Sequence, residues 1–414
     1  MSAVVFPTPT STVLNPSSLE IRTSRSEFET PGSSPLSSPL ALPMRTLRPP
    51  VSIKEKELLA KIGDKLNNLP SGHVTGRQSG EYGPLIDPFN RVVKDLRISI
   101  TDRCNFRCTY CMPQEGMQWI DRHEILTFEE ITRIARICVE RWGFDGIRLT
   151  GGEPTVRAQL PRLIAKLKEI VSPVTNKEIE VSMTTNGATL RLLAHDLRDA
   201  GLNRVNISCD SLHRDRFHQM TRRDQFERVM EGIDAAIEVG FEPIKLNVVV
   251  MRDVNDDEMV DFATFGREKG IQPRFIEFMP LDAEEGWSLD KVFTADEILS
   301  AISSVYPIEA VKKGSEPATV YRYLDGKGSF GVIPSVTKPF CESCDRVRLT
   351  AEGKFRTCLF AIEEFDLRGL LRGGGSDQEI ANEIERAVGK KWAGHSIGNV
   401  NFIRPKRSMS QIGG

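Results

Sequence analysis

Six of the eight cysteines stand in two tight groups, and thiolates at such spacings bind metals. The first group, Cys104, Cys108 and Cys111, has a C-x3-C-x2-C pattern. Three thiolates on one loop can hold three irons of a four-iron cubane and leave the fourth iron open to a small molecule. The alternative is a structural zinc site, but zinc takes four closed ligands and no nearby His or Cys supplies the fourth. The pattern therefore predicts an iron–sulfur cluster.

The second group, Cys341, Cys344 and Cys358, has a C-x2-C-x13-C pattern. It again offers three thiolates, and His395 is the nearest residue that could complete a zinc site, so a closed structural zinc stays open as an alternative here. Arg346 and Arg348 alternate on a predicted strand beside this group, so both side chains should project from one face. Paired guanidinium groups suit an anion such as a phosphate, whereas the plainer alternative is a solvated strand edge.

A glycine-rich loop accompanies the first group. The segment Arg148-Leu149-Thr150-Gly151-Gly152-Glu153-Pro154 places bare backbone and a carboxylate at the carboxyl end of a predicted strand. Two adjacent glycines allow a charged ligand to approach main-chain carbonyls closely.

Alternating strands and helices must position these residues. Apolar residues recur at spacings of three and four in the predicted helices, as at Ile131, Ile134, Ala135 and Cys138, and at Val229, Ile233, Ala236 and Ile237. Six strands, each followed by a helix, predict an α/β fold: a partial (β/α)6 TIM-like barrel whose loops after the strands carry the chemistry. The predicted strands are Leu96–Ile100, Gly146–Leu149, Ile179–Met183, Arg204–Ile207, Ile244–Val250 and Pro273–Glu277.

Three parts follow along the chain. Residues 1–80 form a Ser/Thr/Pro-rich extension and linker that we expect to be disordered, apart from a short helix near 53–66. Residues 81–305 form the barrel with the first cluster. Residues 306–414 form a smaller C-terminal cluster-binding domain with short strands at 320–323 and 330–333 and a Gly-Gly tail.

Composition excludes several classes of protein. The chain has 414 residues, 39% hydrophobic and 27% charged, and a formal net charge of −2, which fits a soluble globular protein. No apolar run approaches the ~20 residues of a membrane span, and the near balance of charges argues against a nucleic-acid-coating surface. The first twenty residues contain no basic residue, so we expect a cytoplasmic protein, with the mitochondrial matrix as the alternative if the extension is a transit peptide.

The motifs together resemble the radical S-adenosylmethionine enzymes, whose cluster motif and Gly-Gly-Glu-Pro segment occur in this order on a partial (β/α)6 barrel. The resemblance covers roughly residues 92–282. It implies that the first cluster donates one electron to bound S-adenosyl-L-methionine. The cofactor then splits to methionine and a radical that abstracts an unactivated hydrogen atom.

A narrower resemblance runs from about Asp87 to the last residue. It rests on Leu96-Arg97-Ile98-Ser99, Thr184-Thr185-Asn186-Gly187, Ser208-Cys209-Asp210-Ser211-Leu212, the Cys-Asp-Arg-Val-Arg-Leu-Thr segment and the terminal Gly413-Gly414. These segments are similar to the GTP 3′,8-cyclase family of molybdenum cofactor biosynthesis. The resemblance implies a lyase with two [4Fe-4S] clusters that converts GTP to (8S)-3′,8-cyclo-7,8-dihydroguanosine 5′-triphosphate, with GTP near the open iron of the second cluster.

The same resemblance implies roles for single residues. The six grouped cysteines would bind metal, and the tail would reach into the active site. Cofactor contacts would be Tyr110, Gly152, Glu153, Ser208 and Met279. Substrate contacts would be Arg97, Arg148, Thr184, Lys245, Arg346, Val347 (through its backbone) and Arg348. Catalytic residues would be Arg97, Gly413 and Gly414.

The implied partners are a one-electron reductant, a cyclic pyranopterin monophosphate synthase downstream and a second copy in a homodimer. Two rival functions stay open: another radical S-adenosylmethionine enzyme with an auxiliary cluster that modifies a peptide, and a zinc-binding module without catalysis. Cys138 and Cys209 are interpreted as packing residues, and Asp253–Asp257 as a helix cap. The basic segment with Arg404, Lys406 and Arg407 is expected to be drawn toward an anionic substrate pocket.

Overall fold

The computed structural model describes residues 83–282, 284, 286–311, 316–397 and 402–413. The predicted extension with its short helix and the terminal Gly414 lie outside these residues. No helix in the described ranges is long and apolar enough to cross a membrane.

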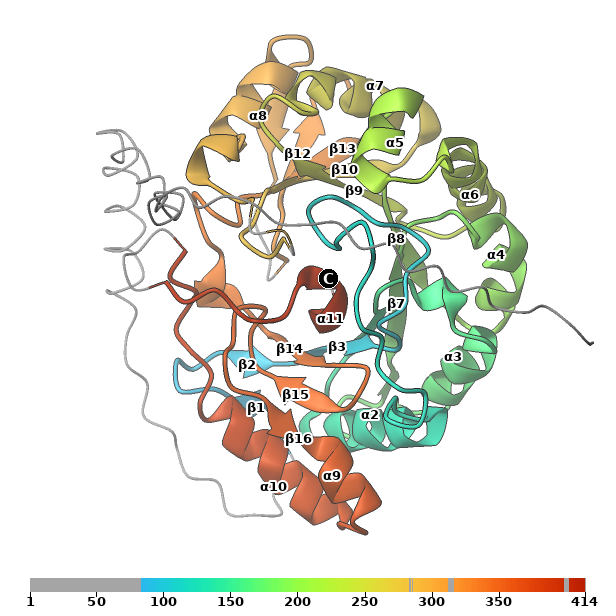
Figure 1. The fold of residues 1–414 in the computed structure, drawn as a ribbon, viewed down its shortest axis with the longest axis vertical. Coiled ribbons are helices and arrows are strands. Elements are labelled where there is room, and N and C mark those ends of the chain that lie inside the picture. Colours follow the sequence, from blue (N-terminus) through green and yellow to red (C-terminus); the bar gives the residue numbers. More distant parts are fainter. Residues whose placement is uncertain (1–82, 283, 285, 312–315, 398–401, 414) are drawn as a thin grey trace, which may run out of the picture. The chain divides into compact units, whose positions relative to one another are not determined.

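A twelve-stranded sheet organises the molecule, in the order β11-β12-β13-β10-β9-β8-β7-β4-β3-β14-β15-β16. The six predicted strands are confirmed, each within two residues of its predicted bounds, and they lie side by side in parallel. They are β3 (Asp95–Ser99), β4 (Gly146–Thr150), β7 (Glu180–Thr185), β8 (Arg204–Ser208), β9 (Lys245–Val250) and β10 (Gln272–Glu277). The sheet curves round into an incomplete barrel (Figure 1).

The C-terminal segment extends this sheet at both edges. The parallel strand β13 (Ser329–Ile333) pairs with β10, and the parallel strand β14 (Arg346–Leu349) pairs with β3. The predicted short strands are therefore present, as β12 (Thr319–Tyr323) and β13. Antiparallel pairing adds β11 (Ile308–Ala310), β12, β15 (Lys354–Arg356) and β16 (Phe365–Asp366). The domain boundary predicted at 305/306 stays a prediction, and strands from both sides of it share one sheet.

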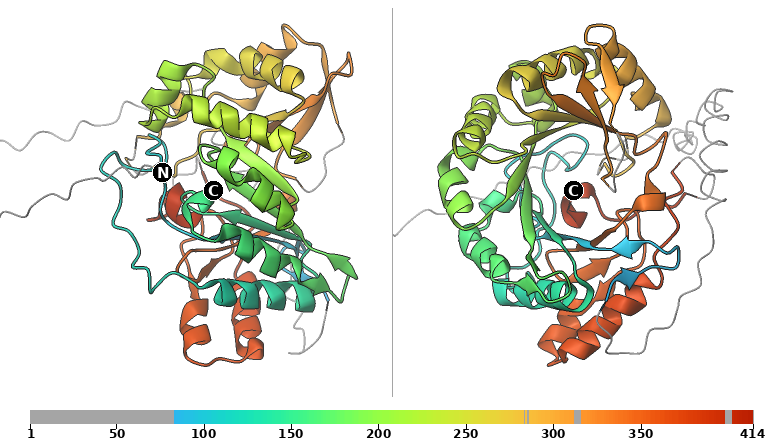
Figure 2. Two further views of the ribbon diagram at one scale, coloured as in Figure 1. Left: turned by 90° about the vertical axis from the view of Figure 1, so that its right-hand side faces the viewer. Right: turned by 180° about the vertical axis from the view of Figure 1, so that it is seen from behind.

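Helices cover the outer face of the sheet (Figures 1 and 2). Those between the barrel strands are α2 (Phe128–Trp142), α3 (Leu160–Lys168), α4 (Leu190–Asp199), α5 (Arg214–Thr221), α6 (Phe226–Glu238), α7 (Met259–Lys269) and α8 (Ala295–Ser303). The C-terminal segment adds α9 (Leu367–Arg372), α10 (Asp377–Val388) and α11 (Met409–Ile412). Two-residue ladders pair β1 (Leu85–Ile86) with β2 (Val92–Val93), and β5 (Val171–Ser172) with β6 (Lys177–Glu178). Short 3-10 turns cover Pro154–Val156, Asp256–Glu258, Leu289–Lys291 and Cys341–Ser343.

The predicted apolar faces form the core between helices and sheet. All four predicted positions of α2 are buried, as are Val229, Ile233 and Ala236 of α6. The prediction was wrong for Ile237, which is 37% exposed because it lies in the last turn of α6, at the margin of the apolar stripe. Cys138 and Cys209 are buried as expected.

Strand alternation separates this core from the inside of the barrel. Leu96 and Ile98 of β3 belong to the core, whereas Arg97 between them lines an interior cavity. Successive side chains of a strand point to opposite faces, so apolar residues face the helices and polar residues face inward. The barrel therefore has a dry outer layer and a charged interior.

One close approach in this layer predicts a stability effect. A Cβ at Gly232 of α6 would collide with the carbonyl oxygen of Gly187, in the loop after β7. We expect Gly232→Ala to destabilise the protein by about 1–3 kcal/mol through overpacking, seen as a lower thermal midpoint by circular dichroism. Gly389→Ala is the matched control, because Gly389 has a helical φ of −60° and its Cβ would meet nothing closer than 3.4 Å. Equal midpoints for the two variants would contradict the prediction.

Candidate functional site

Three arginines face the inside of the barrel on neighbouring strands. Arg348 of β14 pairs in register with Arg97 of β3, which pairs with Arg148 of β4. Burial lowers the pKa of Arg97, and the charges of Arg148 and Arg348 lower it further. The Nε atoms of Arg97 and Arg148 are buried and have no hydrogen-bond partner in the described residues. Buried donors of one charge without acceptors fit an anionic ligand.

A cavity of about 300 Å³ extends this row toward the amino ends of the strands. Further cations in its walls are Lys94, Arg204, Lys245, Arg274 and Arg346. The walls also contain the carboxylates of Asp95, Asp145, Glu180, Glu316 and Asp345. Burial and the neighbouring Arg274 lower the pKa of Lys245 to about 8. We expected the loops after the strands to carry the chemistry. That expectation was incomplete, because these charged residues lie at or near the amino ends of their strands.

Arg204 and Arg274 were missed by sequence reasoning. Both stand on strands that were predicted, at inward positions where a charged side chain is unusual. That signal could have found them. Ser182 of β7 lies between Arg148 and Arg204 in the sheet, because it pairs in register with Arg148 on one side and with Arg204 on the other.

The first cysteine group lies on the loop directly after β3, at the opposite ends of the strands. Its three thiols are partly buried. Burial raises the pKa of Cys108, and the charges of Cys111 and Cys104 raise it further. The loop is tied to α5 by two main-chain bonds, from Thr109 N to Met220 O at 2.9 Å and from Arg107 N to Thr221 O at 3.0 Å.

The number of thiols in each group, three, fits a cluster with one open iron better than a closed zinc site. In the ranges that the structure describes, no three His, Cys, Asp or Glu side chains converge closely enough to hold one ion. A zinc ion requires its ligands within about 2.0–2.3 Å of one point. A four-iron cubane instead takes one thiolate per iron, so its ligands stand farther apart.

The glycine pair packs against the first cysteine loop. A Cβ at Gly151 would come within 2.5 Å of Thr101 O, and one at Gly152 within 2.5 Å of Asp102 O. Gly152 N also donates to Thr101 O at 2.8 Å. The predicted close approach is present, but the backbone that comes close is that of residues 101–103. The glycines thus set the position of the loop that carries the thiols.

Glu153 joins two loops of the site. Its carboxylate is 1% exposed and accepts bonds from Thr185 Oγ1 at 2.7 Å, Asn186 N at 2.7 Å and Thr155 Oγ1 at 2.6 Å. Burial raises its pKa, and these hydrogen bonds oppose the rise. A cofactor contact by Glu153 stays a prediction, and its observed contacts hold the loops after β4 and β7 together.

The second cysteine group lies beside the amino end of β14. Lys391, which is 4% exposed, donates to Arg346 O at 2.6 Å and Thr357 O at 2.7 Å and lies 3.9 Å from Cys344 Sγ. Against the effect of burial, Lys391 and Arg346 lower the pKa of Cys344 to about 7. A thiol held near its ionised form is suited to bind iron.

Two arginines and a histidine lie near the second cysteine group. Arg346 and Arg348 are 9% and 6% exposed, so the alternative of a solvated strand edge was wrong. His395 packs against the Phe360 ring at 5.0 Å between centroids, and it forms no single-ion site with the cysteines. Arg91 was missed: its guanidinium donates to Cys341 O at 2.7 Å and to Ala393 O at 2.7 Å.

The tail enters the barrel (Figure 1). Arg348 donates to the carbonyl oxygen of Gly413. Gly413 has a φ of +80°, and a Cβ there would collide with Thr150 Oγ1 and lie 3.2 Å from Ser99 Cβ. Only glycine fits this left-handed position between the carboxyl ends of β3 and β4.

The remaining predicted residues lie around the same interior. Thr184 accepts a 3.5 Å bond from Asn206 Nδ2, and Asn206 pairs in register with Lys245. Ser208 ends β8, and Met279 packs with Met409 of the tail in one apolar cluster. Val347 is fully buried in the core, with only its backbone available to a ligand.

The expectation for the basic segment before the tail was wrong. Arg404 pairs with Asp282 at 3.0 Å, and Arg407 pairs with Glu352 at 2.6 Å and Glu364 at 2.5 Å. These carboxylates, far away in sequence, neutralise the arginines and hold the segment on the protein, so it is not free to approach the cavity. Lys406 is exposed.

Comparisons with known proteins match most of the chain to described families. Residues 98–266 match the radical SAM superfamily and residues 271–397 match the family described as molybdenum cofactor synthesis C. A GTP 3′,8-cyclase of Streptomyces coelicolor is 45% identical over 333 residues, which cover 80% of this chain and 96% of that protein. One of Paenarthrobacter nicotinovorans is 41% identical over 356 residues, 82% of this chain and 99% of that protein.

Among solved structures, SuiB of Streptococcus suis bound to S-adenosylmethionine is 13% identical with a TM-score of 0.49, over 72% of this chain and 69% of that one. That likeness is too distant to add to the argument. The matches to both family models and the identity over nearly the whole length of the relatives decide the question: this chain belongs to the GTP 3′,8-cyclase family of radical S-adenosylmethionine enzymes.

Proposed function

We propose that this protein converts GTP to (8S)-3′,8-cyclo-7,8-dihydroguanosine 5′-triphosphate, the first step of molybdenum cofactor biosynthesis. The observation that carries the proposal is the row Arg348–Arg97–Arg148 between two groups of three thiols, with the Gly413 carbonyl bound to Arg348. A nucleoside triphosphate carries negative charges that would balance the positive charges of these arginines. S-adenosyl-L-methionine and two [4Fe-4S] clusters, when bound, would supply the electron and the radical that removes a ribose hydrogen.

The residues of the chain would position the substrate for that chemistry. Cys104, Cys108 and Cys111 would hold the first cluster, and Cys341, Cys344 and Cys358 the second. The arginine row, with Lys245 and Arg274, would bind the triphosphate. The tail, which lies between the arginine row and the carboxyl ends of β3 and β4, would limit the motion of the ribose and exclude water.

The partners proposed with this function are a one-electron reductant, a cyclic pyranopterin monophosphate synthase that takes the product, and a second copy of the chain. A cytoplasmic location goes with the same proposal. The family membership supports GTP as the substrate.

Glu316 already occupies part of the cationic cavity. Its carboxylate oxygens lie 3.4 and 3.5 Å from Lys245 Nζ, and it also pairs with Arg274. The side chain is 48% exposed, so it can leave when a stronger anion arrives. Glu316 is therefore expected to compete with the triphosphate.

The cysteine groups give the first test of the function. Replacing Cys104, Cys108 and Cys111 together by Ala should halve the iron content after anaerobic reconstitution and abolish release of 5′-deoxyadenosine, while GTP still binds. Replacing Cys341, Cys344 and Cys358 should halve the iron but leave that release. Cys138→Ala, in the buried face of α2, is the control and should keep all of the iron. Full iron content in the first triple variant would refute the assignment.

The tail gives a second test. Gly413→Ala should reduce cyclised product by about tenfold to a hundredfold, because a displacement of the tail by about 1 Å misplaces the ribose. Release of 5′-deoxyadenosine should persist, so the ratio of product to deoxyadenosine falls. Gly374→Ala is a matched control, since Gly374 has a similar φ of +81° but a Cβ there meets nothing within 4 Å. An unchanged ratio in Gly413→Ala would show that the tail plays no part.

Removing the competing charge gives a third test. Glu316→Gln should tighten GTP binding by roughly threefold to tenfold, measured calorimetrically, because Lys245 and Arg274 are released to the triphosphate. Glu309→Gln is the control: Glu309 pairs with the exposed Arg322, outside the residues that line the cavity. Weaker binding by Glu316→Gln would mean that Glu316 instead holds the two cations in place.

A further inference from the structure

A buried carboxylate lies beside the first cysteine loop. Asp210, two residues beyond the end of β8, is 4% exposed. Its Oδ2 accepts a 2.6 Å bond from the hydroxyl of Tyr110, the residue that directly precedes Cys111 in the loop. Its Oδ1 accepts a 2.8 Å bond from Val249 N of the next strand. Neither bond neutralises the charge, because both donors are neutral groups.

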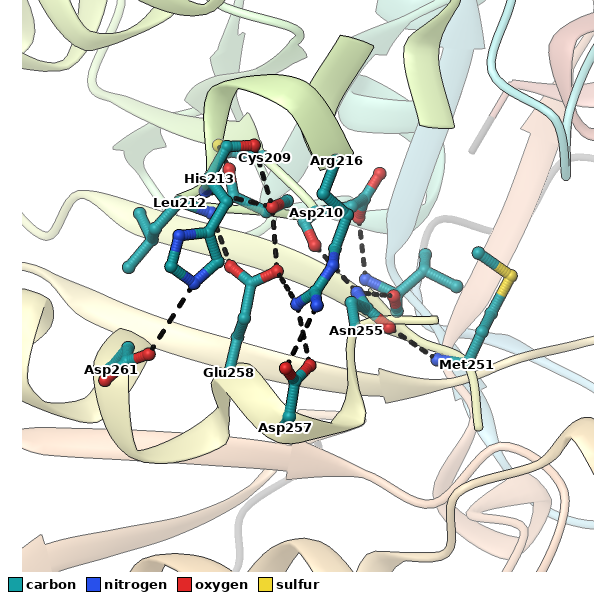
Figure 3. Close-up of polar contacts among 12 residues, drawn as sticks. Cys209, Asp210, Leu212, His213, Arg216, Met251, Asn255, Asp257, Glu258 and Asp261 are labelled. Atoms are coloured by element: carbon teal, nitrogen blue, oxygen red, sulfur yellow. Dashed lines mark hydrogen bonds and ion pairs between the residues drawn. The ribbon is translucent and has the colours of Figure 1, made fainter. Parts of the chain in front are cut away.

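A rigid polar network holds this carboxylate in place (Figure 3). Asn255, which is fully buried, donates to Asp210 O at 2.7 Å and to Val249 O at 2.9 Å. It also accepts a 2.8 Å bond from Met251 N. Asn255 stands at the cap position of the 3-10 turn Asp256–Glu258, as predicted for this segment, but its side chain makes no capping bond. The side chain instead ties the segment after β8 to the segment after β9.

A second buried carboxylate completes the network. Glu258 accepts bonds from Ser211 Oγ at 2.7 Å and from Leu212 N at 2.6 Å. Arg216 of α5 donates to Glu258 at 2.5 Å and to Asp257 at 2.6 Å. Because the end of α5 also carries the two main-chain bonds to the cysteine loop, the network fixes Asp210 relative to the thiols.

In the described residues, the groups that donate hydrogen bonds to the Asp210 carboxylate include no cation. The Tyr110 hydroxyl joins the Asp210 carboxylate to the cysteine loop, because Tyr110 stands between Cys108 and Cys111. Burial raises the pKa of Asp210 itself to about 6, and the bonds from Tyr110 and Val249 N oppose that rise. Each carboxylate oxygen accepts a hydrogen bond, which favours the ionised form.

We propose that Asp210 is a positioning residue whose fixed negative charge lowers the reduction potential of the first cluster. An electron added beside a buried negative charge is repelled in a medium of low dielectric constant. Cluster potentials depend on such nearby charge and on hydrogen bonding. A lower potential makes the reduced cluster a stronger donor, as cleavage of a sulfonium requires. The inference rests on the proposed function only in that a [4Fe-4S] cluster binds at Cys104, Cys108 and Cys111.

The experiment is an anaerobic redox titration of the reconstituted holoenzyme without GTP, followed by electron paramagnetic resonance. The first cluster is identified by the signal that changes when S-adenosyl-L-methionine is added. Asp210→Asn keeps the shape and removes the charge, and we expect it to make reduction of this cluster roughly tenfold more favourable, a rise of about 59 mV for one electron. The signal of the second cluster should not shift.

Asp257→Asn is the matched control. Asp257 also pairs with Arg216 but is exposed and makes no bond to Asp210 or Tyr110, so its loss should leave the potential unchanged. Glu258→Gln tests a purely structural role, since it weakens the network that holds Asp210 while the Asp210 charge remains. We expect that variant to lose iron or thermal stability without a comparable rise in potential.

An unchanged or lower potential in Asp210→Asn would overturn the proposal. So would a loss of iron in that variant with no shift in the clusters that remain. Because GTP is absent from the titration, the result does not depend on whether the protein cyclises GTP. A failure of the proposed function and a failure of this inference are therefore seen in different measurements.

Discussion

Buried guanidinium groups repel one another unless acceptors lie among them. Arg97, Arg148 and Arg348 occupy paired positions on three adjacent strands, inside a barrel whose outer layer is apolar. The chain supplies part of what they require, since Asp95 lies 3.7 Å from Arg97 Nε and the Gly413 carbonyl accepts from Arg348. Buried charges without partners are costly, so the folded protein is poised to bind a polyanion there.

The cations and the first group of thiols lie at opposite ends of the strands. Cations gather at the amino ends of the strands, and the first group of thiols follows the carboxyl end of β3. Gly413 is placed between them, against Ser99 and Thr150. The second group of thiols lies beside the amino end of β14, at the same end of the strands as these cations.

Sequence reasoning succeeded where the signal was local. The six parallel strands followed from short β-branched runs, whereas the binding of clusters by the two cysteine groups stays a prediction from their spacing. It failed where a partner lies far away in the chain. Lys391 contacts Cys344 and Arg91 contacts Cys341 without any pattern at their own positions. Asn255 does stand at a helix cap, but only the fold shows that its side chain bonds to Asp210, after β8, and to Val249 of β9.

Gly151 and Gly152 show a second limit of prediction from sequence. The residue type correctly indicated a close approach, but the sequence could not say which backbone comes close. The nearest atoms belong to residues 101–103 of the same chain, and they are brought there by the pairing of β3 with β4. Local chemistry thus predicted the constraint, and topology decided what fulfils it.

The pairing of β3 with β14 has a consequence for how the chain folds. Its two strands are separated by roughly 250 residues, and contacts of such long range form slowly because a long loop must close first. At synthesis rates of about 5–20 residues per second, β3 waits on the order of 10 s or more with one edge unpaired. An unpaired strand edge is a template for aggregation. The nascent barrel is therefore expected to depend on chaperones until β14 leaves the ribosome and covers that edge.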